Sequence, residues 1–107
     1  MLYIKMERVI YMTLLEQQEI AANVLKQPLS VIQDLSFVDE KTGILCLISQ
    51  FKDDDTLMTK EEMQGYKGGF VFLVGTDGGV LTSGSMYSLG QLIELYKQGE
   101  RSNIEND

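Results

Sequence analysis

Near the start of the chain, apolar residues recur at helical spacing. The segment Thr13-Leu14-Leu15-Glu16 has the form of a capping box, in which Thr13 and Glu16 each bond the other's backbone amide. Pro28 cannot continue the pattern, because it has no amide hydrogen to donate. We therefore predict a helix over residues 14–26. Its predicted buried stripe comprises Leu14, Ala21, Val24 and Leu25.

After Pro28 the period of the pattern changes to two, which is typical of a half-buried strand. One face of this predicted strand carries Leu29, Val31, Leu35 and Phe37, while Ile32 falls on the face shared with Ser30, Asp34 and Ser36. A polar turn follows at residues 39–43, and Ile44 to Ile48 is a short apolar run suited to a central strand. We predict that the two strands form a hairpin.

The second half of the chain repeats these signals. Thr59-Lys60-Glu61-Glu62 is another capping box, which predicts a single helical turn that ends by Gly65. The strand-like run Phe70 to Val74 and the strand Val80 to Thr82 flank Asp77-Gly78, a strong hairpin signal because both residue types tolerate positive φ. A third capping box starts at Ser88 and predicts a helix over residues 89–98.

This order of elements predicts an α+β fold. We expect an antiparallel sheet of about four strands, arranged as two hairpins and covered by an N-terminal and a C-terminal helix. The apolar runs at 44–48 and 70–74 are the expected centre of the sheet, covered on both faces. With 107 residues, the chain suits a single domain spanning residues 1–107.

At the two ends of the chain, the pattern of apolar and polar positions is less clear. The polar residues 100–107 are predicted to form a frayed tail. Residues 1–11 have two interpretations that we hold equal. Glu7-Arg8-Val9 can be encoded by a purine-rich stretch resembling a bacterial ribosome-binding site, so that translation begins at Met12 and residues 1–11 are a mis-assigned leader. Alternatively, the alternating apolar positions form an edge strand or a short helix.

Composition narrows the function classes. Nine Lys and Arg against sixteen Asp and Glu give a net charge of −7, which disfavours direct binding to nucleic acid or an anionic membrane and favours a basic partner. With no His and a single Cys, the chain lacks a Ser-His or Cys-His nucleophile pair, a His or Cys zinc site and an internal disulfide. No apolar run has the length of a membrane span, and we expect a cytoplasmic protein without a bound cofactor.

Acidic residues are densest between residues 53 and 62, a segment that contains five carboxylates and one Lys. The sixth and twelfth positions of a calcium-binding EF-hand starting at Asp53 would need Gly and Glu, but hold Met58 and Gln64. A solvated loop, a docking surface for a basic partner and an irregular calcium or magnesium site therefore remain as alternatives. Met58, Met63 and Tyr66 lie next to the carboxylates, and an acidic rim around such a patch is typical of an interface.

From these observations we predict a small, non-enzymatic interaction protein, regulatory or neutralising, that binds a basic protein through this loop. The predicted partner-binding residues are Asp53, Asp54, Asp55, Met58, Glu61, Glu62, Met63 and Tyr66. No catalytic residue and no metal ligand is predicted.

An alternative function is a small-molecule-sensing domain with a pocket between the sheet and the C-terminal helix. Its predicted polar contacts are Ser83, Ser85 and Tyr87. Cys46 lies within the apolar run 44–48 and is interpreted as a core residue rather than a nucleophile. An exposed edge strand could also pair two copies of the chain into a homodimer.

Overall fold

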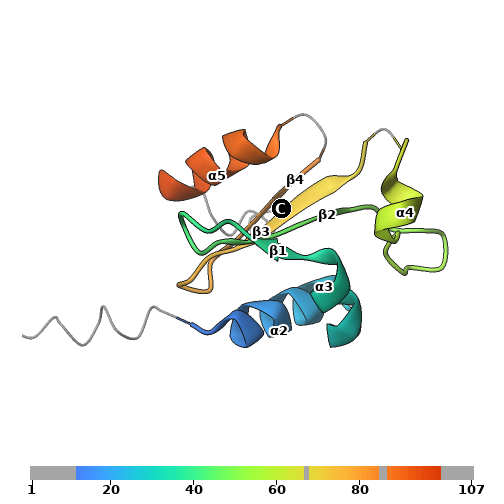
Figure 1. Cartoon of the computed structure of the whole chain (residues 1–107), viewed down its shortest axis with the longest axis horizontal. Helices are drawn as coiled ribbons and strands as arrows, with labels where there is room; N and C mark the ends of the chain where they lie inside the picture. Colours follow the sequence, from blue (N-terminus) through green and yellow to red (C-terminus); the bar gives the residue numbers. More distant parts are fainter. Residues whose placement is uncertain (1–11, 67, 85–86, 100–107) are drawn as a thin grey trace, which may run out of the picture.

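Helices and sheet form three layers in the computed structural model, which describes residues 12–66, 68–84 and 87–99 (Figure 1). Helices α2 (Leu14–Leu25) and α3 (Leu29–Leu35) lie on one side of a four-stranded antiparallel sheet, and α5 (Leu89–Lys97) lies on the other. The one-turn helix α4 (Lys60–Met63) stands at one end of the sheet. The predicted α+β class is confirmed.

Capping boxes begin three of the helices as the sequence predicts. In α2, Thr13 N donates to Glu16 Oε1 at 2.8 Å and Glu16 N donates to Thr13 Oγ1 at 3.1 Å. The same reciprocal pair begins α4 at Thr59 and α5 at Ser88. Because the first amides of a helix have no partner inside it, these pairs fix where each helix starts.

The predicted buried stripe of α2 is only half right. Ala21 and Leu25 are buried, but Leu14 and Val24 are 46% and 39% exposed. The position that replaces them in the interior is polar, because Gln17 is buried against the sheet. Its Nε2 donates to the carbonyls of Gly43 at 2.9 Å and Val74 at 3.0 Å, which offsets the cost of burying the amide.

The predicted strand from Leu29 to Phe37 is wrong over most of its length, because residues 29–35 form the helix α3. As predicted, α2 ends before Pro28, but Pro28 is also the residue that precedes the new helix, and its carbonyl accepts from Val31 N at 3.1 Å. At this capping position the missing amide hydrogen costs nothing. Ile32 and Leu35 are the buried residues of α3, so the true spacing is three, and Ile32 was assigned to the wrong face.

Four strands pair in the order β1-β2-β3-β4. They are β1 (Phe37–Val38), β2 (Leu45–Ser49), β3 (Phe70–Val74) and β4 (Val80–Ser83), and each pairs antiparallel with its neighbour. The predicted hairpins are both present, although the first keeps only two residues of its first strand. β2 and β3 are central as expected, and Gly78 in the second turn has φ +83°.

Two buried clusters lie on the two faces of the sheet, as the apolar runs predict. The cluster facing α2 and α3 includes Leu35, Leu45, Leu47, Leu57 and Phe72. The cluster facing α5 includes Ile44, Cys46, Leu73, Leu81, Leu92 and Tyr96.

Tyr96 joins α5 to the β3–β4 turn. Its hydroxyl donates to Asp77 Oδ1 at 2.6 Å and lies 3.1 Å from the carbonyl oxygen of Gly79. The ring passes so close to Gly75 that a Cβ there would lie 1.8 Å from the Tyr96 hydroxyl oxygen. Gly75 is therefore required by the approach of this side chain.

The predictions for residues 1–11 and 100–107 lie outside the described residues. Within the described ranges, every helix is too short or too polar to cross a bilayer. The two edges of the described sheet are β1 and β4, and pairing of two copies through one of them stays a prediction.

Candidate functional site

The connection between β2 and β3 is a structured projection at the end of the sheet, which we call the acidic lobe and define as residues 50–66 (Figure 1). Its first part is a small hairpin, in which Phe51 bridges Leu57 and Lys52 N donates to the Thr56 carbonyl at 2.8 Å. The hairpin tip carries Asp53, Asp54 and Asp55. Asp55 has φ +67°, a left-handed conformation that aspartate tolerates better than most residues.

A buried leucine and two hydrogen bonds are among the contacts that attach the acidic lobe to the rest of the molecule. Leu57 is only 4% exposed and belongs to the cluster under α2 and α3. Ser49 Oγ, at the end of β2, donates to the Met58 carbonyl at 2.9 Å. Gln27 Nε2, just after α2, donates to the Asp55 carbonyl at 2.8 Å. This apolar anchor and these two hydrogen bonds therefore help to fix the lobe relative to the sheet and to α2.

Two of the five predicted carboxylates hold the lobe together. Asp54 Oδ1 accepts from Thr56 N at 3.1 Å and from Thr56 Oγ1 at 2.5 Å, and these hydrogen bonds lower the pKa of Asp54. Glu62 Oε1 accepts from Thr59 N at 2.8 Å and lies 3.3 Å from Lys52 Nζ. The amide of Thr59 first, and then Lys52, lower the pKa of Glu62, so both carboxylates stay ionised at neutral pH.

The other three carboxylates are those of Asp53, Asp55 and Glu61. None of them makes a hydrogen bond or ion pair with a residue that the structure describes, and all three residues are exposed. Asp53 and Asp55 lie at the hairpin tip, whereas Glu61 lies on α4 and faces α3 across a groove. The predicted acidic cluster thus contains two kinds of carboxylate: those that stabilise the lobe through hydrogen bonds, and those that are exposed without a described partner.

The apolar residues predicted for the site are divided in the same way. Tyr66 is 42% exposed, but Met58 and Met63 are half-buried. A Cβ on Gly69 would lie 3.2 Å from Met63 Cε, so this methionine lies against the chain just before β3. Sequence reasoning missed Phe51, an exposed ring that stacks on Phe70 at 5.5 Å between centroids. Its signal was an aromatic residue two positions after a central strand.

Of the three interpretations of the acidic cluster, a metal site has the least structural support. Among the described residues, no group of three His, Cys, Asp or Glu side chains is arranged to hold a metal ion. Asp54 and Glu62 already accept hydrogen bonds from Thr56 and Thr59.

Two of the three residues of the alternative small-molecule site, Ser83 and Tyr87, lie within the described structure. Ser83 is half-buried on β4, Tyr87 is 41% exposed before α5, and Ser85 lies outside the described residues. The space between the sheet and α5 is filled by the buried cluster that contains Leu81 and Leu92. A shallow hollow beside Tyr87 runs along α5 past Gln91, and Ser83 does not line it.

Cys46 is fully buried in β2, as predicted for a core residue. Burial, followed by the nearby negative charge of Asp39, raises the pKa of its thiol to about 11. Because the thiolate is the reactive form of cysteine, this side chain is poorly suited to nucleophilic chemistry at neutral pH.

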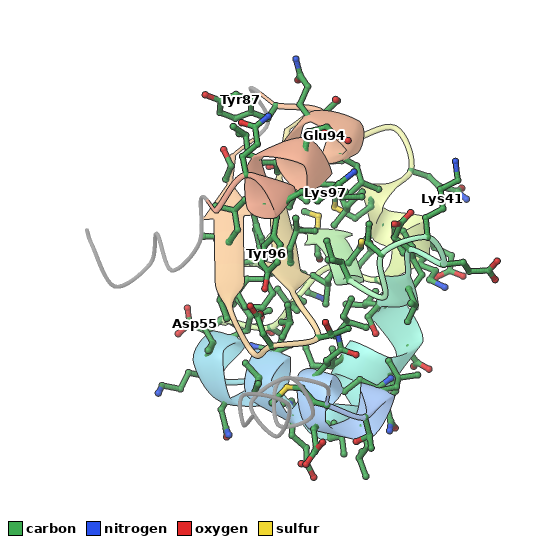
Figure 2. All side chains as sticks on the ribbon, turned by 90° about the vertical axis from the view of Figure 1, so that its left-hand side faces the viewer. Lys41, Asp55, Tyr87, Glu94, Tyr96 and Lys97 are labelled. Carbon is green, nitrogen blue, oxygen red and sulfur yellow. The ribbon has the colours of Figure 1, made fainter. Side chains whose placement is uncertain are left out.

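The two candidate surfaces lie on opposite sides of the sheet. Figure 2 shows Asp55 on the α2 side and Tyr87 on the α5 side. A single compact ligand could not bridge them, because the sheet lies between. They are therefore separate candidate sites.

Comparison with known proteins adds no relative to this picture. No protein-family model matches the chain, and no curated protein or solved structure matches it.

Proposed function

We propose that this protein acts by binding a basic partner protein through the acidic lobe. The observation that carries the proposal is the attachment of the lobe: Leu57 and the Gln27 side chain fix it to the domain. On this support, the carboxylates of Asp53, Asp55 and Glu61 are exposed and have no ionic or hydrogen-bonding partner among the described residues.

A fixed acidic surface has two advantages for binding. Little conformational entropy remains to be lost when the partner binds, because the backbone of the lobe is already ordered by its own hydrogen bonds. The exposed carboxylates, together with the net charge of −7, accelerate encounter with a positively charged protein. The exposed ring of Tyr66 adds apolar contact area of the kind enriched in interfaces.

Support for catalysis or small-molecule sensing is weaker. The thiol of Cys46 is buried with a raised pKa, and the interior next to α5 is filled by side chains. We therefore carry forward protein binding alone.

The test is affinity capture of the tagged protein from an extract of its source, washed at low and moderate salt. The lobe variant combines Asp53→Lys with Asp55→Asn, and asparagine suits the left-handed φ at position 55. We expect basic proteins to be captured by the wild-type protein, to be lost as salt rises, and to be lost from the lobe variant.

The matched control combines Glu19→Lys with Glu40→Gln, which changes the net charge equally at two exposed positions outside the lobe. It should capture the same basic proteins as the wild-type protein. Equal capture by the lobe variant and the control would contradict the proposed function, as would capture that salt does not weaken.

A further inference from the structure

A groove of about 360 Å³ separates α3 from the end of the acidic lobe. Its floor is apolar and is formed by Leu35 of α3 and Leu57 of the lobe, and Val31 of α3 also lines it. Leu35 and Leu57 are buried core residues, whereas Val31 is half-buried and lies at the solvent side. The groove is near the small end of the range for ligand sites, about 300–1,000 Å³, which suits one or two side chains rather than a whole cofactor.

Charged side chains from both walls form the rim of this groove. Asp34 lies on the α3 wall and Glu61 on the α4 wall, with Lys60 beside Glu61. None of the three makes a hydrogen bond or ion pair with a described residue. A cation in the mouth of the groove would therefore have a carboxylate on each side, and the rim retains a negative balance even with Lys60 included.

We propose that this groove receives one aliphatic side chain from a lysine- or arginine-containing segment of the partner protein. The apolar floor would bury the aliphatic group, and Asp34 and Glu61 would flank a neighbouring basic residue. The inference rests on the proposed function, because the segment belongs to the same basic partner. It adds that recognition needs an apolar anchor and extends beyond the lobe to α3.

The test uses two short synthetic peptides of equal length and charge as probes. One alternates lysine with leucine, and the other alternates lysine with serine. Binding to the full chain is followed by NMR, through the methyl signals of Val31, Leu35 and Leu57. We expect the lysine–leucine peptide to shift these methyl signals and to bind about tenfold more tightly than the lysine–serine peptide, since burying one aliphatic side chain is worth about that factor.

Val31→Lys places a cation and a longer side chain at the solvent side of the groove. The added charge acts on both peptides, but only the lysine–leucine peptide also loses the burial of its leucine, so it should be weakened about tenfold more than the lysine–serine peptide. The matched control is Val24→Lys, the same substitution at an exposed valine of α2 that does not line the groove. A thermal unfolding measurement shows that both variants fold.

The possible failures of the two proposals are distinguishable. If Val31→Lys leaves the lysine–leucine peptide unchanged while Asp53→Lys/Asp55→Asn weakens it, the groove inference is overturned and the proposed function stands. If Val31→Lys weakens that peptide and the lobe variant does not, the groove inference stands and the proposed role of the lobe tip is contradicted. Self-association of the peptide-free protein that Val31→Lys abolishes would identify a second copy as the occupant and overturn the inference.

Discussion

The two faces of the sheet are covered in different ways. On one face, two helices and the acidic lobe share a single buried cluster, to which the lobe contributes Leu57. On the other face, the nine-residue helix α5 is the cover, and Ile48 of β2 remains 41% exposed. Each face also has one buried polar side chain that reaches a turn at the far end of the sheet, Gln17 on the first and Tyr96 on the second.

This difference supports the proposal that the lobe, rather than the α5 side, is the binding surface. The lobe is fixed by side chains that the fold buries in any case, so the exposed carboxylates of Asp53, Asp55 and Glu61 are free of a structural task. On the α5 side, the polar groups that could contact a ligand include Tyr96, which is occupied in joining the helix to Asp77 and Gly79. The four predictions below test this contrast.

Removal of the lobe's anchor should have the largest effect. Leu57→Ala deletes a buried side chain from the cluster under α2 and α3, and we expect the free energy of unfolding to fall by about 2–5 kcal/mol. Urea unfolding followed by circular dichroism measures this change. Ile48→Ala, an aliphatic deletion at the exposed position on the other face, should cost far less.

The contrast would break if Leu57→Ala left global unfolding unchanged and accelerated amide exchange within the lobe alone. The lobe would then be a separately unfolding unit and not part of the core.

A methyl group at Gly75 should be the next most disruptive change. Its Cβ would lie 1.8 Å from the Tyr96 hydroxyl oxygen, so Gly75→Ala displaces Tyr96 and loosens α5. We expect a loss of about 1–3 kcal/mol in urea unfolding, the usual cost of overpacking. Gly90→Ala, in open space within α5, should be neutral or slightly stabilising, since alanine favours helix more than glycine does. An equal loss from both variants would argue against the close approach of Tyr96.

Tyr96→Phe removes only the hydroxyl and should cost about 0.5–1.5 kcal/mol, the net value of a typical hydrogen bond. Tyr87→Phe, on an exposed ring, should change the free energy of unfolding little. The double variant Gly75→Ala/Tyr96→Phe sharpens the test, because both changes act on the same contact. Its loss should be smaller than the sum of the two single losses, and strict additivity would contradict the coupling.

Local features of this fold were predictable from sequence. The capping boxes at Thr13, Thr59 and Ser88 join residues three positions apart, and the structure contains both hydrogen bonds of each. The β3–β4 hairpin is likewise set by its own turn. The error at residues 29–35 had a local cause as well: Pro28 forbids continuation of α2 but permits a new helix immediately after it.

The nonlocal parts of the site could not be predicted. Sequence proximity indicates that the carboxylates at 53–62 lie near one another, but not that Glu62 pairs with Lys52 while Glu61 faces α3. Asp34 and Glu61 are far apart in sequence, and both line the groove because α3 packs beside the lobe. The burial of Gln17 could not be predicted either, because the sheet brings together its two acceptors, the carbonyls of Gly43 and Val74.

The smallest expected effect is a difference between the starts of α4 and α5 in their response to acid. The capping box of α4 uses the carboxylate of Glu62, whereas that of α5 uses the neutral amide of Gln91. The amide of Thr59 and then Lys52 lower the pKa of Glu62 in the folded protein. A carboxylate with a lowered pKa stabilises the fold above its unfolded-state pKa, and that contribution is lost as pH falls through the folded-state value.

Acidification should therefore loosen the start of α4 and leave the start of α5 unchanged. We expect the NMR signal of the Thr59 amide to move between neutral pH and about pH 3, and that of Ser88 to stay. Glu62→Gln keeps an oxygen acceptor without the titrating charge, so its Thr59 signal should lose most of the pH dependence. If the Thr59 and Ser88 amides moved alike, or if Glu62→Gln left the Thr59 response intact, the titration would come from global unfolding and the acid sensitivity would not belong to the lobe.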